Sequence, residues 1–295
     1  MKSPQKFTAW LRALRIWQWP KNLLVFVPLV TSHRLLEPDA LAGVGMAFVS
    51  FSLLSSGTYL FNDLRDVEFD RQHPRKKFRP IANSEISFAS ARGGALVLGA
   101  ATVAIALQLP PLFWGILGSY LVLTTAYTLR IKQIPLLDTV LLAGLYSLRL
   151  LAGHAAGAIS FSSWLLTFTF FIFLSLALLK RHSELLILTD SEQDEVLGRG
   201  YLSSDHPLVR ALGVGSGLLS VLVLMLYTNS PAVQKLYEQP QVLLLLCPLG
   251  ICWIGRMWLL AERRLLHDDP VIFTLRDRWS YLLVVLAGLV MVAAK

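Results

Sequence analysis

Hydrophobic runs of roughly 20 residues recur along the whole chain, and this feature limits the fold more than any other. A run of about 20 apolar residues is long enough to cross the hydrocarbon core of a bilayer as an α-helix. The chain is 55% hydrophobic and only 16% charged, whereas soluble domains carry about 25% charged residues. The sequence therefore predicts an all-α integral membrane protein, and it excludes a soluble enzyme and a disordered chain.

Nine such spans are predicted, joined by mostly short loops. Pro20 and Pro28 interrupt the first span, although neighbouring helices can satisfy the backbone groups that proline frees. No polar stretch is long enough for a soluble domain, so residues 1–295 are predicted to form a single membrane domain. The two longest loops, residues 62–88 and 180–207, are where catalytic residues are expected. The predicted spans are residues 18–32, 40–61, 89–107, 112–130, 136–157, 163–180, 208–228, 241–260 and 276–294.

The residues before the first span have the pattern of an amphipathic helix. Apolar residues recur there at helical spacing with basic residues between them, which predicts an interfacial helix over residues 1–17. Arg12 and Arg15 interrupt any continuous apolar core, so this segment is not predicted to be a signal peptide. The apolar positions are Phe7, Trp10, Leu11, Leu14 and Trp17.

The distribution of positive charge predicts the orientation. The net charge is +8, but Lys and Arg lie between the spans and do not form a nucleic-acid-binding patch. With the N-terminus in the cytoplasm, 23 of the 27 basic residues fall on the inner side together with both long loops. Arg34, Lys235 and Lys295 fall outside, and Arg149 lies within a span. We therefore expect a multi-pass protein of the cell membrane with its N-terminus inside, its C-terminus outside and no nucleic-acid partner.

An acidic motif begins the first long loop. Asp63, Asp66 and Asp70 have the i, i+3, i+7 spacing that places them on one face of a continuous helix. Carboxylates this close repel one another unless a cation binds between them, and hard oxygen ligands suit Mg²⁺. Because Mg²⁺ usually adds substrate phosphates to one or two carboxylates, the motif, which starts at Asn62, predicts a site for a phosphorylated substrate. The alternative is a helix end whose solvated carboxylates pair with neighbouring arginines.

A basic segment follows the acidic motif directly. Five of the ten residues from Arg71 to Pro80 are Arg or Lys, which is typical either of an anchor on anionic lipid or of a phosphate site. Carboxylates, a metal ion and this segment together predict a charge-balanced site for a diphosphate. Arg79 is the strongest candidate because Phe78 and Pro80 frame it. The other candidates are Arg75 and Lys77.

These residues resemble the UbiA superfamily of intramembrane prenyltransferases, whose mark NDxxDxxxD corresponds here to Asn62, Asp63, Asp66 and Asp70. In detail they are similar to one branch, the decaprenyl-phosphate phosphoribosyltransferases, and the similarity covers nearly the whole chain. The motifs that carry it are Gln18–Asn22, Asn62–Pro74, Lys76–Ala82, Leu148–Gly153, Lys180–Leu185 and Gly200–Tyr201.

The resemblance implies a nine-helix UbiA-like bundle and a Mg²⁺-dependent glycosyl transfer. Such an enzyme moves 5-phosphoribose from phosphoribosyl diphosphate to a decaprenyl or undecaprenyl phosphate and releases diphosphate, as a step of cell-envelope biosynthesis. Asp63, Asp66 and Asp70 are then the metal ligands and catalytic residues, in a site that faces the cytoplasm. The two substrates and the membrane are the expected partners, and assembly into a homo-oligomer is compatible with the sequence.

The resemblance also points to residues outside the acidic motif. Lys180, Arg181 and Glu184 would bind phosphate and orient a cation or the ribose hydroxyls, although Lys180 and Glu184 also have the spacing of a simple i, i+4 pair. Arg149 is an intramembrane charge, which indicates a functional site unless it only pairs with Asp138. The remaining candidate substrate-binding residues are Lys21, Asn22, Lys132 and Tyr201.

One departure from the superfamily separates the alternatives. Aromatic prenyltransferases carry a second Asp-rich motif after the sixth span, whereas the acidic residues of this region do not open with a DxxxD pattern. This argues against the first alternative, transfer of a prenyl group from a prenyl diphosphate to an aromatic acceptor. A second alternative is a polyprenyl-phosphate or anion transporter, and acidic residues clustered at one membrane face fit an enzyme better.

Overall fold

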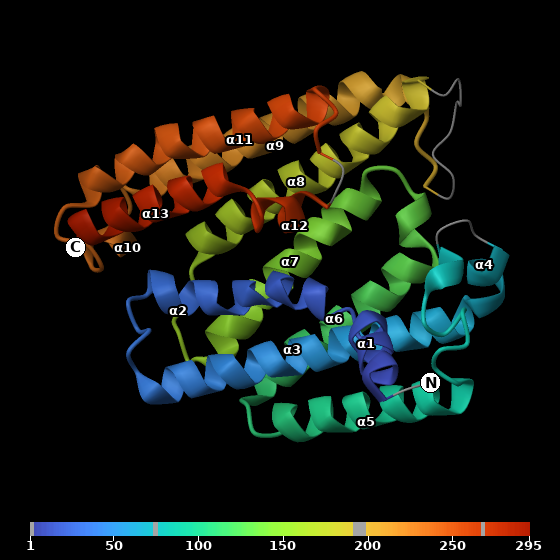
Figure 1. Ribbon diagram of the computed structural model, residues 1–295. Coiled ribbons are helices and arrows are strands. Elements are labelled where there is room, and N and C mark those ends of the chain that lie inside the picture. Colours follow the sequence, from blue (N-terminus) through green and yellow to red (C-terminus); the bar gives the residue numbers. More distant parts are fainter. Residues whose placement is uncertain (1–2, 73–75, 191–198, 267–268) are drawn as a thin grey trace. The chain divides into compact units, whose positions relative to one another are not determined.

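The computed structural model consists of α-helices and 3-10 helices, coloured along the sequence in Figure 1. No β-strand occurs among the residues that it describes, which are 3–72, 76–190, 199–266 and 269–295. The predicted all-α class is therefore confirmed for these residues. The elements are α1 (Ser3–Ala13), η1 (Ile16–Phe26), α2 (Val27–Thr31), α3 (Pro38–Arg65), α4 (Val67–Gln72), η2 (Lys76–Phe78), α5 (Phe88–Ala106), α6 (Pro111–Leu129), η3 (Ile131–Gln133), α7 (Leu137–Ala156), α8 (Ser163–Asp190), η4 (Ser203–Asp205), α9 (His206–Tyr227), α10 (Pro231–Gln234), η5 (Pro240–Leu245), α11 (Leu246–Glu262), α12 (Pro270–Thr274) and α13 (Arg278–Ala293).

Backbone contacts separate the chain into two compact units. Unit 1 comprises Met1–Leu121 and Ala152–Ile159, and unit 2 comprises Val122–Leu151 and Ser160–Lys295. Helix α7 contributes its last residues to unit 1 and the rest to unit 2. The carboxylates of the acidic motif therefore belong to unit 1, and the charged residues of α8 belong to unit 2.

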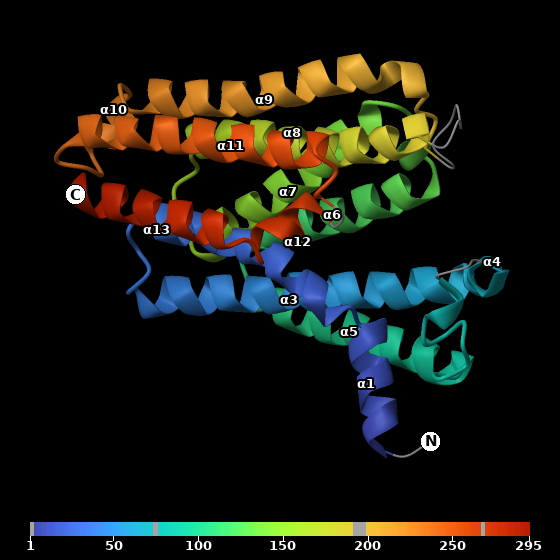
Figure 2. The ribbon, with the colours of Figure 1, turned by 45° about the horizontal axis from the view of Figure 1, so that its top comes forward.

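In unit 1 the long helix α3 lies beside α5, and Figures 1 and 2 agree on this pairing. Glycine also allows α7 to lie very close to α3 and to η1. A Cβ on Gly43 of α3 would lie 2.2 Å from the carbonyl oxygen of Ala156 in α7, and a Cβ on Gly153 would lie 2.0 Å from that of Val25 in η1. Any larger residue at either position would push α7 away from α3 or from η1.

The N-terminal segment departs from the helix predicted over residues 1–17. Helix α1 ends at Ala13, and Arg15 adopts a left-handed backbone conformation with a φ of 50°. The hydroxyl of Ser56 on α3 donates to the carbonyl oxygen of Leu14 at 2.7 Å, and so satisfies a group that a continued helix would have used. The chain continues as η1, where proline inside the element disfavours a regular α-helix.

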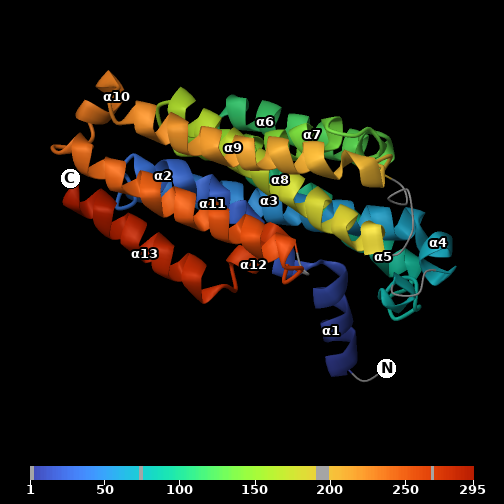
Figure 3. The ribbon, with the colours of Figure 1, turned by 90° about the horizontal axis from the view of Figure 1, so that it is seen from above.

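In unit 2, α8 and α9 pack along each other, α11 packs on both, and α13 contacts α11 (Figure 3). Trp258 of α11 connects three of these helices. Its ring lies over Gly213 of α9, where a Cβ would be 2.3 Å from the indole. Its Nε1 donates to Oγ of Ser175 on α8 at 3.2 Å. One buried tryptophan therefore fixes the spacing of α8, α9 and α11.

Within the described residues, seven helical segments are long and apolar enough to cross a membrane, and they overlap the second to the eighth predicted spans. The ninth predicted span is the 16-residue helix α13, and the first is η1 followed by α2. The membrane class is therefore supported, while the count of nine and the orientation stay predictions. The loop predicted from residue 180 begins later, because α8 continues to Asp190. The seven segments are Pro38–Arg65, Phe88–Ala106, Pro111–Leu129, Leu137–Ala156, Ser163–Ile187, Ser203–Tyr227 and Pro240–Glu262.

Candidate active site

Two aspartates and two arginines of unit 1 form what we call the carboxylate cluster. Asp63 in α3 and Asp70 in α4 are each only 3% exposed. Nη1 of Arg79 lies 3.1 Å from Oδ1 of Asp63 and 2.7 Å from Oδ2 of Asp70. Nη2 of Arg15 lies 2.7 Å from the same Oδ1 of Asp63. Two guanidinium groups thus balance two buried carboxylates, which unpaired would be very costly to bury.

The third aspartate of the motif lies differently from the sequence expectation. Helix α3 ends at Arg65, and Asp66 follows it as a cap with a φ of −95° and a ψ of 11°, so the predicted acidic face is not one continuous helix. Oδ1 of Asp66 lies 3.2 Å from Nε of Arg65, and the Asp66 side chain is 38% exposed. Arg79 contacts both Asp63 and Asp70, whereas the side chain of Asp66 remains accessible to solvent.

The carboxylate cluster offers hard oxygen donors, the ligand type that Mg²⁺ prefers. One nitrogen of Arg79 already bridges both aspartates, so the two carboxylates converge on a single positive charge. The Arg79 side chain is 30% exposed, so part of its guanidinium is open to an incoming anion. The residues present therefore fit a divalent cation together with a phosphate group.

The other predicted residues of unit 1 occupy both buried and exposed positions. Asn22 is 2% exposed, and its Nδ2 donates to a serine hydroxyl of α3 at 3.1 Å. Lys21, which precedes it in η1, and Asn62 near the end of α3 are both partly exposed. Lys77 is exposed, with Nζ 5.2 Å from the centre of the neighbouring phenylalanine ring. Arg75 lies outside the described residues.

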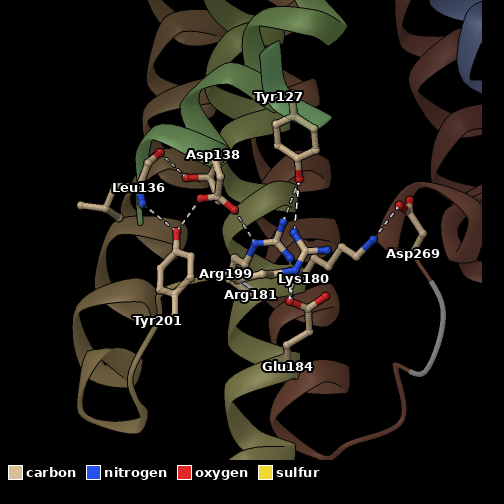
Figure 4. Close-up of polar contacts among 10 residues, drawn as sticks. Tyr127, Leu136, Asp138, Lys180, Arg181, Glu184, Arg199, Tyr201 and Asp269 are labelled. Atoms are coloured by element: carbon tan, nitrogen blue, oxygen red, sulfur yellow. Dashed lines mark hydrogen bonds and ion pairs between the residues drawn. The ribbon is translucent and has the colours of Figure 1, made fainter. Parts of the chain in front are cut away.

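The end of α8 in unit 2 carries a second charged group, the arginine cluster, which Figure 4 shows. The Arg181 side chain is 1% exposed, and its Nε lies 2.7 Å from Oδ2 of the fully buried Asp138. Its Nη1 lies 2.6 Å from Oε2 of Glu184, and its Nη2 donates to the hydroxyl of Tyr127 at 3.3 Å. Nε of Arg199 lies 3.5 Å from the same Oε2 of Glu184. The partly exposed Glu184 carboxylate therefore lies between two guanidiniums.

Tyr201 supports the arginine cluster from within. Its hydroxyl donates to Oδ1 of Asp138 at 2.7 Å and accepts the amide N–H of Leu136 at 2.8 Å. Burial, and then the hydrogen bond to Asp138, raise the pKa of the Tyr201 phenol above its usual 10, so the phenol stays a neutral donor. Gly200, with a φ of 66°, permits this approach, because a Cβ there would lie 2.5 Å from the carbonyl oxygen of Gln133. Tyr201 thus holds Asp138 in place and is itself buried.

The remaining predicted residues of unit 2 are Lys180, Arg149 and Lys132. Nζ of Lys180 lies 3.4 Å from Oδ2 of Asp269 at the start of α12, instead of pairing along its own helix. Arg149 is buried, donates from Nη1 to a carbonyl of α7 at 2.8 Å, and lies 5.2 Å from the centre of the Tyr146 ring. Lys132 lies in η3 and is partly exposed.

Sequence reasoning missed some of these partners. It treats Arg15 only as a basic residue of the N-terminal amphipathic segment, and Asp138 only as an alternative partner for Arg149. An intramembrane carboxylate by itself signals a buried cation nearby, so Asp138 could have been singled out. Its partner Arg181 is 43 residues away in the chain, a distance that helical spacing rules cannot bridge.

Comparison with known protein families now decides the assignment. The model of the UbiA prenyltransferase family matches residues 24–281. The chain belongs to the UbiA prenyltransferase family. The match includes the arginine cluster and, apart from Arg15, the carboxylate cluster.

The relatives of this UbiA-family chain differ in the share of their own length that the match covers. It is 40% identical over 274 residues to the protein y4nM of Sinorhizobium fredii, across 92% of this chain and 53% of y4nM. It is 32% identical over 283 residues to the nodulation protein NoeC of Azorhizobium caulinodans, across 96% and 91%. It is 38% identical over 179 residues to decaprenyl-phosphate phosphoribosyltransferase of Mycobacterium tuberculosis, across 59% of each. The chain thus spans about half the length of y4nM and about three-fifths of the phosphoribosyltransferase.

A solved structure has a similar fold. A UbiA homolog from Archaeoglobus fulgidus, bound to GPP and Mg²⁺, superposes with a TM-score of 0.70 at 17% identity, across 96% of this chain and 99% of the homolog. At this identity the likeness concerns the fold alone. The UbiA fold expected from the acidic motif is therefore present.

Proposed function

We propose that this UbiA-family protein moves 5-phosphoribose from phosphoribosyl diphosphate to a decaprenyl or undecaprenyl phosphate and releases diphosphate. The observation that carries the proposal is the arginine cluster. Arg181 and Arg199 both contact Glu184 of α8, in the region where aromatic prenyltransferases have acidic residues. A donor with two anionic ends needs cations away from the metal as well, and the Arg199 side chain of this cluster and the neighbouring Lys180 side chain are 26% and 36% exposed. The similarity to decaprenyl-phosphate phosphoribosyltransferase supports the same activity.

The carboxylates of Asp63, Asp66 and Asp70 are proposed to hold Mg²⁺ in this reaction. The presence of Mg²⁺ with GPP in the solved homolog supports a divalent metal. When bound, the ion would neutralise the charge that develops on the departing diphosphate. Asp63 and Asp70 are buried and oriented by Arg79, while the more exposed Asp66 is accessible to an ion from solvent.

The protein's own residues are proposed to bind and align the phosphates. The bond between ribose C1 and a diphosphate oxygen breaks, the diphosphate leaves with the electron pair, and a lipid phosphate oxygen bonds to C1. A phosphate monoester has its second pKa near about 6, so the nucleophile is already ionised and needs no general base. Arg79, Lys77 and Lys180 donate to phosphate oxygens, and the buried Arg181 contributes a fixed positive charge behind them. Tyr201 is proposed to support the site through Asp138. The other residues proposed for the substrate site are Lys21, Asn22, Asn62, Arg75, Lys132, Arg149 and Glu184.

We also propose a single membrane domain with nine spans in the cell membrane, an inner N-terminus and a site that faces the cytoplasm. The lengths of η1 (11 residues) and α2 (five residues) support the first span. At about 2.0 Å per 3-10 residue and about 1.5 Å per α residue they reach about 30 Å, the thickness of a hydrocarbon core. A topology reporter fused after Lys295 should be active only outside the cytoplasm, and a cytoplasmic C-terminus would contradict this arrangement.

The decisive experiment supplies the purified chain with radiolabelled phosphoribosyl diphosphate, a polyprenyl phosphate and Mg²⁺. We expect label to enter the lipid fraction only when all three are present. A parallel reaction offers geranyl diphosphate and an aromatic acid. If the protein ignores phosphoribosyl diphosphate and prenylates the aromatic acid, the phosphoribosyl proposal is wrong.

Prenyl transfer to an aromatic acceptor is the second candidate function. The bound GPP and Mg²⁺ of the solved homolog favour it, and the carboxylate cluster would serve it equally well. The arginine cluster distinguishes the two candidates, because a prenyl diphosphate has only one anionic end.

A further inference from the structure

Three metal-ligating side chains meet in unit 2, on a different side of α8 from the arginine cluster. Nε2 of His182 in α8 lies 2.9 Å from Oε2 of Glu262 in α11. The ring of His182 stacks on that of His206 in α9, with 4.5 Å between ring centres. Each side chain offers one ligand atom, and these atoms lie within 4.8 Å of one another. Within the described part of the chain, no other three His, Cys, Asp or Glu side chains come together in this way.

Two ring nitrogens of this group have no hydrogen-bond partner in the described structure. They are Nδ1 of the fully buried His182 and Nε2 of His206, and both atoms are buried. A buried polar atom left without a partner costs about 1–3 kcal/mol, and a bound ion is one way in which a native protein satisfies such an atom. A proton shared by His182 and Glu262 would account for their short contact. It would not account for the nitrogen of His206.

We propose that His182, His206 and Glu262 bind a divalent transition-metal ion of the Zn²⁺ type, which connects α8, α9 and α11. Two imidazoles and one carboxylate form a ligand set typical of Zn²⁺, with a fourth position left for water, whereas Mg²⁺ takes oxygen ligands. Ligand bonds of about 2.0–2.1 Å place tetrahedral ligands about 3.3 Å apart. Side-chain movements of about 1 Å therefore convert the present arrangement into a coordination sphere.

The surroundings of the three side chains fit a metal site. Nη1 of Arg210 lies 3.4 Å from Oε1 of Glu262, so the carboxylate is oriented through the oxygen that does not contact His182. Glu262 is the last residue of α11, where the helix dipole favours a cation. The ring of Trp258 lies 5.2 Å from that of His182 and forms an apolar wall. A surface pocket of α9 offers an entry path and is lined by His206, Pro207, Arg210, Ala211 and Val214.

The proposed ion would act on structure and is independent of the proposed transfer reaction. His182 directly follows Lys180 and Arg181 on α8, but it contacts α9 and α11, whereas Arg181 contacts Asp138 of α7. A metal held there fixes the end of α8 against two neighbouring helices. We therefore expect metal binding to raise the unfolding temperature.

Zinc binding to the purified full chain, with no histidine tag and after removal of metals, tests this directly. Isothermal titration with Zn²⁺ alone should show one site, and Zn²⁺ should raise the unfolding temperature. His206→Gln and Glu262→Gln should each weaken zinc binding by more than about 100-fold, the upper range for loss of a supporting contact around a metal. Matched controls are Glu238→Gln, which changes an exposed glutamate, and His33→Asn, since asparagine tolerates the left-handed backbone at that position. Unchanged zinc binding in both ligand variants would overturn the proposal.

Two further measurements keep the result unambiguous. Asp63→Asn should leave zinc binding intact, because the carboxylate cluster is a different site; loss of the zinc site in that variant would contradict the assignment. X-ray absorption of zinc-loaded wild-type protein should show two imidazoles and oxygen ligands. Sulfur ligation would point to the free Cys247 or Cys252 and would overturn the proposal. This measurement uses wild-type protein, so its result holds even if a variant fails to fold.

Discussion

The carboxylate cluster of unit 1 and the arginine cluster of unit 2 use the same ion-pair chemistry in opposite ways. In unit 1 the negative groups are buried and the cations are partly open: Asp63 is 3% exposed, and Arg15 and Arg79 are 22% and 30% exposed. In unit 2 the cation itself is buried, since Arg181 is 1% exposed and Asp138 is fully buried, while Glu184 is open at 29%.

This difference indicates which partner of each cluster can be exchanged. A partly exposed guanidinium loses little when it turns toward solvent or a phosphate, so the aspartates of unit 1 can accept another cation. Arg181 cannot leave Asp138 without stranding a buried charge. The carboxylates of the first cluster can therefore take up another cation, whereas the second cluster keeps its positive charge fixed.

The largest effect is expected from Asp63→Asn. The substitution keeps the side-chain shape but removes the negative charge that two guanidiniums share, and with it a ligand for the proposed metal. Loss of one preorganised electrostatic contact costs about 10²–10³-fold in turnover, and loss of the ion should abolish it. Turnover is measured on purified protein and normalised to the amount in the membrane. Glu68→Gln, an exposed charge on α4, is the control. Activity within tenfold of wild type would remove Asp63 from the mechanism.

Asp138→Asn should give the next largest effect, on stability. It leaves Arg181 buried without its counter-charge, which costs about 3–5 kcal/mol. The matched control is Asp269→Asn, which removes the charge from the more open pair with Lys180 and should cost no more than about 1 kcal/mol. Thermal or denaturant unfolding in detergent measures both variants. Equal losses would mean that burial does not distinguish the two pairs.

A smaller effect is expected from Arg79→Ala and Lys180→Ala on substrate affinity, measured on folded protein because Arg79→Ala also removes the counter-charge of the buried Asp70. A charge-assisted contact to phosphate contributes about 1.5–3 kcal/mol, which is about 10- to 150-fold in affinity. Both variants should therefore raise the KM for phosphoribosyl diphosphate by this factor and change the KM for the lipid phosphate much less. Steady-state kinetics with each substrate varied in turn separates the two effects. An equal rise for both substrates would contradict the assignment of these cations to the donor.

The sequence predicted the all-helical class, seven of the spans and the acidic motif, because hydrophobic length and charge are properties of short segments. It could not predict that Asp66 ends α3, since that turn depends on tertiary contacts that bring Asp70 to Arg79. The break at Arg15 has the same origin: a hydroxyl from α3 satisfies the carbonyl of Leu14.

The arginine cluster shows the same limit more clearly. Lys180 and Glu184 have ideal spacing for a pair, yet Lys180 contacts Asp269 at the start of α12, and Glu184 contacts Arg181 on its own helix and Arg199. Tyr201, a predicted substrate-binding residue, is buried, and its hydroxyl donates to Asp138. Sequence spacing identified the charged residues, but burial decided which of them form ion pairs.

The smallest effect is expected from Glu37→Gln in the exposed pair of unit 1. Nη2 of Arg34 lies 2.6 Å from Oε2 of Glu37, and this hydrogen bond lowers the pKa of Glu37 below its usual 4.5. A carboxyl group with a lowered pKa in the folded state stabilises the protein above its usual pKa, and the contribution is lost as the pH falls through the lowered value. Both side chains are open to water, so salt screens the pair.

Glu37→Gln should therefore leave the unfolding temperature unchanged at neutral pH and physiological salt. Below about pH 4.5 the variant should lose stability slightly less steeply than wild type, because it has no carboxyl group to protonate at this position. Unfolding temperatures measured from about pH 3 to pH 7 test this, with Asp138→Asn as the contrast. That buried substitution should lower stability across the whole range. A loss from Glu37→Gln as large as that from Asp138→Asn would show that exposure does not set the strength of ion pairs in this protein.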